Sequence, residues 1–141
     1  MQKLMPFIED NFILVAGFIL TVALLIINEL RGYAKGVRPL SPAQLVTAIN
    51  REKTSLIDVR DENSFATGHI IHSKNYPKQT LANHLTKLEE FKHCRVVLIC
   101  AMGQQAASSA VLLKKHGFTN INFLQGGITA WRNAGLPLAK D

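Results

Sequence analysis

Residues 96 to 117 read "VVLICAMGQQAASSAVLLKKHG", a continuous apolar run followed at once by a segment with the pattern of a helix. An uninterrupted β-branched run, as opposed to an alternating one, indicates a strand that is buried on both faces, as in a parallel sheet. The helix after it is expected to end at Gly117, since glycine is favoured just past the last helical turn. Cys100 therefore stands at the carboxyl end of a buried strand, immediately before a helix.

Strands and helices alternate through the rest of this part of the chain. Ser41 and Pro42 form a typical N-cap and first-turn pair, and Asp61 can cap a short helix that ends at Gly68. The other expected elements are a short strand before residue 41, strands "SLIDV" (55–59) and "NINFL" (120–124), a stub of strand at "NYP" (75–77) and an amphipathic helix "TLANHLTKLEEF" (80–91). This alternation predicts an α/β domain with a parallel sheet, helices on both faces, and a site beyond the carboxyl ends of the strands.

The position of Cys100 allows two interpretations. Free cysteine is often buried and packs as a small hydrophobic residue, so the thiol could belong to the core. The amides of a helix N-terminus also stabilise anions, which suits a nucleophilic thiolate. The candidate substrate-binding loop supplies such amides, and its Gly103 can adopt dihedral angles closed to other residues; it consists of Ala101, Met102, Gly103, Gln104 and Gln105.

The N-terminal part of the chain contains "NFILVAGFILTVALLII", residues 11–27, which carries no charge. As a helix, these seventeen residues span roughly 25 Å, against about 30 Å for the hydrocarbon core of a bilayer. We expect a single transmembrane anchor, with a cleaved signal peptide or a buried helix as alternatives. Glu9 and Asp10 stand where a signal peptide would carry basic residues, and no A-x-A-like cleavage site follows the run.

Flanking charge predicts the orientation of this anchor. Lys3 stands alone before the run, whereas Arg31, Lys35 and Arg38 follow it, which places the C-terminal domain in the cytoplasm at the inner (plasma) membrane. The expected organisation is an anchor over 1–30, a linker over 31–36 and a domain over 37–141. From residue 31 onward, 15 Lys and Arg outnumber 7 Asp and Glu, a balance that favours a surface near anionic lipids. These cations occur singly and without interleaved aromatic residues, which argues against nucleic-acid binding.

The chain contains only two cysteines, Cys94 and Cys100, too few for a disulfide scaffold and without C-x-x-C spacing. His69 and His72 lie on an extended segment at a spacing that suits a shared metal poorly. We therefore expect neither a metal nor a cofactor. Cys94 and Cys100 should lie about 20 Å apart, at opposite ends of one strand.

Four stretches together resemble the rhodanese (sulfurtransferase) domain: "LIDVR" (56–60), "FATGHI" (65–70), "CAMGQQA" (100–106) and "LQGGITAWRNAGLPL" (124–138). They occur in the order and approximate spacing of that family, and the resemblance covers roughly Val37 to Lys140. It implies a three-layer α/β domain with a five-stranded parallel sheet, similar to single-domain rhodaneses tethered by an N-terminal helix. In this family the loop cysteine takes a sulfur from a donor, holds it as a persulfide and passes it to an acceptor thiol. Cys100 matches that cysteine.

The sequence departs from the family pattern at Gln105, because the loop usually reads C-x-x-G-x-R. An arginine there would make charge-assisted contacts with an anionic donor, whereas Gln105 offers only neutral ones. We expect weak recognition of thiosulfate and a donor that is a protein persulfide or another neutral group. His72 and Ser73 also replace a Gly-Ala pair that is common in the family.

The sequence allows two other functions. The domain could be a catalytically weak or inactive module that binds a membrane-associated protein partner. A phosphatase or arsenate reductase of related fold is disfavoured, because C-x5-R requires an arginine where Ala106 stands.

Three other residues suggest structural roles. Asp58 and Arg60 are expected to form an ion pair or cap that orders the loops, with a part in acid–base steps as the alternative. His69 is expected to be a hydrogen-bonded structural histidine, with proton transfer as the alternative. Trp131 should anchor the last helix in the core.

Overall fold

The computed structural model describes residues 3–34 and 37–140, which form two separate compact units. The first unit contains α1 (Leu4–Asp10) and α2 (Phe12–Ala34), and the side chain of Asn11 between them donates to the Phe7 carbonyl at 3.1 Å. Large apolar side chains of α2 are exposed, for example Ile13 at 84% and Leu14 at 72%.

No single helix in the described residues has the length and apolar composition of a membrane span. Helix α1 and the part of α2 up to Asn28 have the length and apolar composition of a span only when they are taken together, and the two are bent by 91° at the break between them. Helix α2 continues through residues 31–34, the first four of the expected linker 31–36. Residues 35 and 36 lie outside the described residues.

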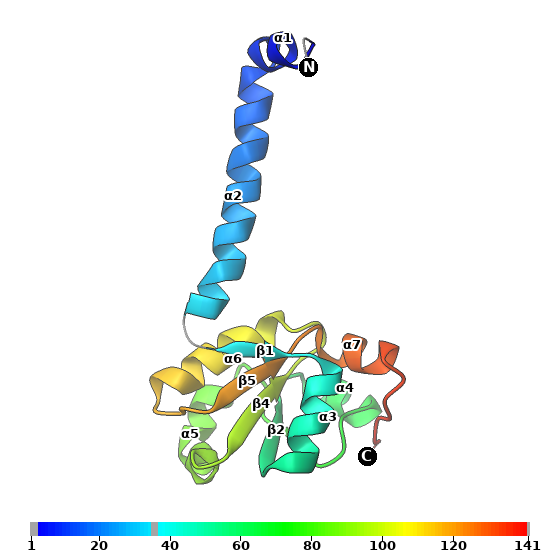
Figure 1. Cartoon of the computed structure of the whole chain (residues 1–141). Coiled ribbons are helices and arrows are strands. Elements are labelled where there is room, and N and C mark those ends of the chain that lie inside the picture. The colour runs from blue at the N-terminus through cyan, green and yellow to red at the C-terminus, as the bar shows by residue number, and fades with distance from the viewer. Residues whose placement is uncertain (1–2, 35–36, 141) are drawn as a thin grey trace. The chain divides into compact units, whose positions relative to one another are not determined.

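The second unit is built on a five-stranded sheet in which every neighbouring pair is parallel (Figure 1). Its strands are β1 (Arg38–Leu40), β2 (Thr54–Asp58), β3 (Lys74–Asn75), β4 (Arg95–Ile99) and β5 (Ile121–Leu124). They lie in the order β1-β5-β4-β2-β3, so the apolar strand β4 is central. The predicted five-stranded parallel sheet is confirmed.

Helices cover both faces of the sheet. They are α3 (Pro42–Arg51), α5 (Leu85–Leu88), α6 (Gln104–Lys115) and α7 (Gly127–Asn133). The short helix α4 (Glu62–Thr67) has no buried residue and follows β2 at the carboxyl edge. Helix α3 begins in a capping box, because Ser41 Oγ accepts from the Gln44 amide at 3.2 Å while Gln44 Oε1 accepts from the Ser41 amide at 2.9 Å. The amphipathic helix expected over 80–91 is instead α5 flanked by two 3₁₀ turns, η1 (Leu81–His84) and η2 (Glu89–Phe91).

Side-chain alternation along β4 divides the core into two clusters. Val96, Leu98 and Cys100 pack on the side of α5 and α6, in a cluster that includes Leu88 and Leu113. Val97 and Ile99 pack on the opposite side, where α3 and α7 contribute Leu45, Ile128 and Trp131 (Figure 1). A strand buried on both faces explains why its sequence is continuously apolar. Cys100 directly follows the last residue of β4 and therefore lies at the carboxyl edge of the sheet.

Candidate active site

Cys100 is the first residue after β4, and its side chain is 2% exposed. Its Sγ accepts a hydrogen bond of 2.8 Å from the backbone amide of Gly103. The residue belongs to the core cluster beneath α6, but its sulfur also faces a backbone donor. An amide aimed at sulfur favours a negative charge there, whereas purely apolar surroundings would oppose one.

The loop that leads from Cys100 into α6 brings the candidate binding residues to the carboxyl edge. Ala101, Met102, Gln104 and Gln105 are exposed, while Gly103 is buried and has φ +99°. A Cβ at residue 103 would lie 3.1 Å from the Gly126 amide nitrogen, so the position requires glycine for both dihedral and space. The first amides of α6 have no acceptor within the helix. The loop therefore presents backbone donors, and its side chains carry no charge.

Helix α7 holds this loop through its own first amides. The Ile128 amide donates to the Cys100 carbonyl at 2.9 Å, and the Thr129 amide and Oγ1 both donate to the Ala101 carbonyl at 3.1 Å. The C=O and N–H of a trans peptide point in opposite directions. Anchoring these two carbonyls on α7 therefore turns the amides of Ala101 and Met102 away from α7.

Two glycines permit this close approach. Gly126 and Gly127 have φ +73° and +58°, and a Cβ on Gly127 would collide with the Cys100 carbonyl oxygen and lie 2.6 Å from the Ala101 carbonyl carbon. Sequence reasoning did not assign Gly127 or Thr129 to the site. The available signal was the Gly-Gly pair directly before a helix, since two consecutive positive-φ residues indicate a backbone approach that side chains would prevent.

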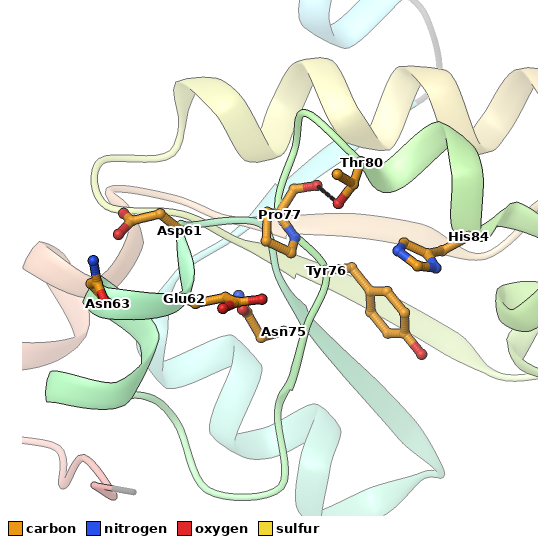
Figure 2. A pocket seen from close by; sticks show the side chains of 8 residues that line it. All are labelled: Asp61, Glu62, Asn63, Asn75, Tyr76, Pro77, Thr80 and His84. Carbon is orange, nitrogen blue, oxygen red and sulfur yellow. Dashed lines mark hydrogen bonds between the residues drawn. The ribbon is translucent and has the colours of Figure 1, made fainter.

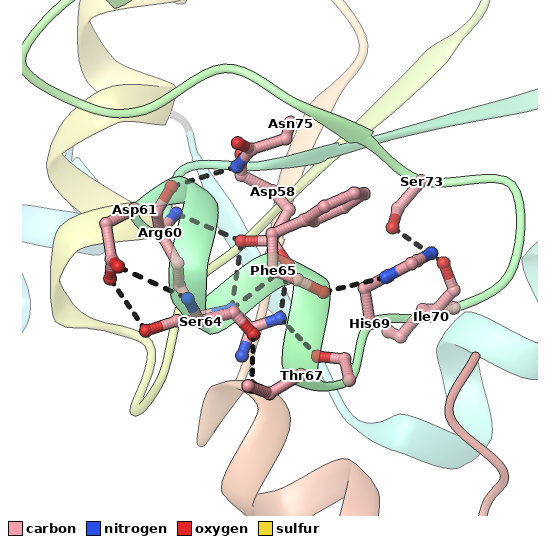
Figure 3. A network of polar contacts seen from close by, with 11 residues as sticks. Asp58, Arg60, Asp61, Ser64, Phe65, Thr67, His69, Ile70, Ser73 and Asn75 are labelled. Carbon is pink, nitrogen blue, oxygen red and sulfur yellow. Dashed lines mark hydrogen bonds and ion pairs between the residues drawn. The ribbon is translucent and has the colours of Figure 1, made fainter. Parts of the chain in front are cut away.

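Asp58 and Arg60 form a buried ion pair, as predicted (Figure 3). Arg60 Nη2 lies 2.8 Å from Asp58 Oδ2 and also donates to the Gly68 carbonyl at 2.7 Å. The Asn75 side-chain amide donates to the Asp58 and Arg60 carbonyls at 3.1 and 2.9 Å. This network joins the ends of β2, α4 and β3, so the guanidinium orders loops.

His69 and Trp131 also have the structural roles expected of them. His69 Nδ1 lies 2.8 Å from the Phe65 carbonyl oxygen, and its ring stacks on Phe65 at 3.9 Å between centroids. Trp131 is buried and donates from Nε1 to the Pro137 carbonyl at 3.0 Å. Cys94 contacts Ser55 Oγ at 3.3 Å and lies just before β4, at the opposite end from Cys100. Across residues 3–34 and 37–140, no three His, Cys, Asp or Glu side chains are grouped to hold a metal ion.

A cavity of about 530 Å³ opens at the carboxyl edge of β2 and β3 (Figure 2). Its lining comprises Asp61, Glu62, Asn63, Asn75, Tyr76, Pro77, Thr80 and His84, with two carboxylates and no lysine or arginine. Two hydrogen bonds hold the pKa of Asp61 below its usual value. The larger effect comes from the Ser64 hydroxyl and the next from the Ser64 backbone amide. Asp61 therefore stays ionised, which makes this side of the carboxyl edge unfavourable for an anionic ligand.

Comparison with known proteins identifies the domain. The profile of the rhodanese-like domain matches residues 41–134. An uncharacterized Escherichia coli K12 protein, YibN, is 28% identical over 141 residues, which cover 99% of both chains. The thiosulfate sulfurtransferase GlpE of Pseudoalteromonas translucida is 30% identical over 95 residues, 67% of this chain and 89% of that one. The crystal structure of a rhodanese-related protein from Thermoplasma volcanium is similar with a TM-score of 0.67 and 29% identity, and the match covers 74% of this chain and 99% of that one.

Proposed function

The chain belongs to the rhodanese-like domain family, and on that premise we propose that it is a membrane-tethered sulfurtransferase that carries sulfane sulfur as a persulfide on Cys100. One observation carries the proposal: the Gly103 amide donates to Cys100 Sγ at 2.8 Å within a loop that opens a helix. The similarity to proteins named thiosulfate sulfurtransferase supports the reaction class.

The proposed reaction has two displacement steps at sulfur. The Cys100 thiolate attacks the outer sulfur of a donor persulfide or thiosulfate, and the donor's S–S bond breaks so that the departing thiolate or sulfite keeps the electron pair. Cys100 then holds the transferred sulfur as a persulfide anion. An acceptor thiolate attacks that outer sulfur and releases the Cys100 thiolate. The Gly103 amide and the first amides of α6 stabilise the negative charge in both steps.

The charges around the loop favour a neutral or protein-bound sulfur donor over thiosulfate. Residues 101–105 carry no charged side chain, and Gln105 is exposed where the family usually has an arginine. Asp61 and Glu62 line the cavity at the same edge of the sheet. A dianion would meet neutral donors and two carboxylates there, and would bind weakly.

We propose that residues 11–27 tether the protein to the inner membrane, with the C-terminal domain in the cytoplasm. Exposed apolar side chains surround this part of α2, including Phe18 at 71% and Leu25 at 65%. A helix that is apolar all round needs a core or a lipid environment to cover it. Protease added to intact spheroplasts should spare the domain. Digestion under those conditions, or release of the full chain by a carbonate wash, would contradict the tether.

Mass spectrometry of the protein after exposure to a sulfane donor tests the persulfide. We expect one added sulfur on Cys100, removed by an acceptor thiol and absent from Cys100→Ser. The matched control is Cys94→Ser, which should load as the wild type does.

The second candidate is a rhodanese-like binding module without turnover, which the burial of Cys100 and the uncharged loop favour. A folded protein that takes up no sulfur from either a small persulfide or thiosulfate would replace the first proposal with this one.

A further inference from the structure

Positive charge gathers at one edge of the sheet. Because the strands are parallel, the connections that enter β2, β4 and β5 meet at the edge opposite Cys100, here called the amino edge (residues 51–53, 89–95 and 114–120). Lys74 begins the short strand β3 further along the sheet, in register with Ile57, and its side chain extends to Glu90 and Phe91 of this edge. The cations of the amino edge include Arg51, Lys53, Lys92, Arg95 and Lys115. The carboxyl edge presents the uncharged loop 101–105, the acidic start of α4 and a single exposed lysine after β3, Lys78.

Contacts between the connections make the amino edge one continuous surface. Arg95 Nε pairs with Glu52 Oε1 at 2.7 Å, which joins the start of β4 to the end of α3. Lys74 Nζ lies 4.7 Å from the Phe91 ring centroid, which joins β3 to η2. Lys92 Nζ lies 5.6 Å from the Phe118 ring centroid, which joins the segment after η2 to the segment before β5.

The carboxylates of this surface are matched by neighbouring cations. Glu52 pairs with Arg95, Glu89 lies 3.6 Å from Lys92, and Glu90 lies 4.0 Å from Lys74. Arg51, Lys53 and Lys115 are exposed, and the described part of the chain offers them no ion-pair partner. The surface therefore keeps an excess of accessible positive charge.

We propose that the amino edge docks on anionic lipid headgroups. The chain enters the domain at Val37, directly before β1 and so at this same edge, and the preceding helix carries the apolar residues 12–27. Juxtamembrane cations are attracted to anionic leaflets, and singly spaced cations spread over several connections suit a plane of headgroups. Docking there leaves Cys100, at the opposite edge, open to sulfur donors and acceptors in the aqueous phase. That the domain meets such a membrane in the cell rests on the proposed tether by residues 11–27.

Vesicle binding by the domain of residues 37–141 tests this surface without the apolar helix. The domain can be studied alone, because both core clusters consist of residues 37–138. The Thermoplasma volcanium structure is matched over 99% of its length by 74% of this chain, so a similar protein of that size folds without further segments. We expect sedimentation with vesicles of phosphatidylglycerol and phosphatidylcholine, little with phosphatidylcholine alone, and loss of binding as salt is raised.

Charge variants locate the surface. Lys53→Gln and Lys115→Gln should each lower the vesicle partition coefficient about fivefold, and together about twenty-five-fold. Lys78→Gln is the matched control, because Lys78 follows β3 at the carboxyl edge; its binding should stay within about twofold of wild type. Thermal unfolding of each variant checks that the fold is intact.

The outcomes separate this proposal from sulfur transfer. Equal binding to both kinds of vesicle, an equal effect of Lys78→Gln, or tighter binding to a polyglutamate peptide or duplex DNA than to the vesicles would overturn lipid docking. Cys100→Ser should bind vesicles as the wild type does. Loss of persulfide formation therefore leaves this result unchanged, and loss of vesicle binding leaves Cys100 chemistry unchanged.

Discussion

Replacing Gly127 with alanine should displace the loop that carries Cys100. The new Cβ would collide with the Cys100 carbonyl oxygen and lie 2.6 Å from the Ala101 carbonyl carbon, both of them backbone atoms. Restoring an ordinary contact requires a shift of about 1 Å, which breaks the 2.9 Å hydrogen bond from Ile128 to Cys100 and the 3.1 Å bond from Thr129 to Ala101.

The magnitude follows from three terms. A non-glycine residue at positive φ costs about 1–2 kcal/mol, and each lost hydrogen bond costs about 0.5–1.5 kcal/mol. Gly127→Ala should therefore lower the free energy of unfolding by about 2–5 kcal/mol. Gly135→Ala is the matched control, because Gly135 has φ +75° with nothing within 4 Å of its added Cβ. The control contains only the dihedral term, so it should cost about 1–2 kcal/mol.

Urea unfolding measures the stability difference, and the rate of sulfur uptake on Cys100 measures the displacement. A shift of about 1 Å in a reacting group lowers a rate by about a hundredfold, so Gly127→Ala should load sulfur that much more slowly. Gly135→Ala should load at the wild-type rate. The reasoning is refuted if the two variants lose the same stability, or if Gly127→Ala loads sulfur normally.

Three further predictions concern single side chains. Gln105→Arg should raise kcat/KM for thiosulfate about tenfold or more, since a charge-assisted hydrogen bond contributes about 1.5–3 kcal/mol; an unchanged rate in a folded protein argues against anion binding as the limit. His72→Gly should raise the free energy of unfolding by about 0.5–1 kcal/mol, because His72 has φ +67° in a turn that favours glycine; a lower urea midpoint would contradict this. Hydrogen bonds from Ser64 lower the pKa of Asp61, so its contribution to stability is present above the unfolded-state pKa and is lost as pH falls through the folded-state value. Asp61→Asn should reduce the fall of the free energy of unfolding at acid pH, measured by urea unfolding at a series of pH values. An unchanged pH dependence would contradict this prediction.

The fold could be predicted because local signals agreed along the domain. Strand β4 is apolar on both faces, and Ser41 and Asp61 cap the helices expected after them. The segment 80–91 was predicted as one helix but contains α5 between two 3₁₀ turns. Its apolar spacing keeps Leu81 and Leu88 buried in either form, so the pattern fixes the buried face and not the hydrogen-bond type.

The site was predictable only where it is local in sequence. Cys100 and Gly103 are three residues apart, and a strand that ends before a helix places an amide near the thiol without other information. The support from Gly127 and Thr129 comes from a helix 27 residues further on, and no periodicity links the two segments. The Gly-Gly pair indicated an unusual backbone but could not say which backbone it approaches. Glycine is required at 127 because the Cys100 carbonyl oxygen occupies the space of a side chain, and at 126 because a Cβ would lie 2.6 Å from Ala130 Cβ. The loop geometry therefore depends on residues that carry no chemistry of their own.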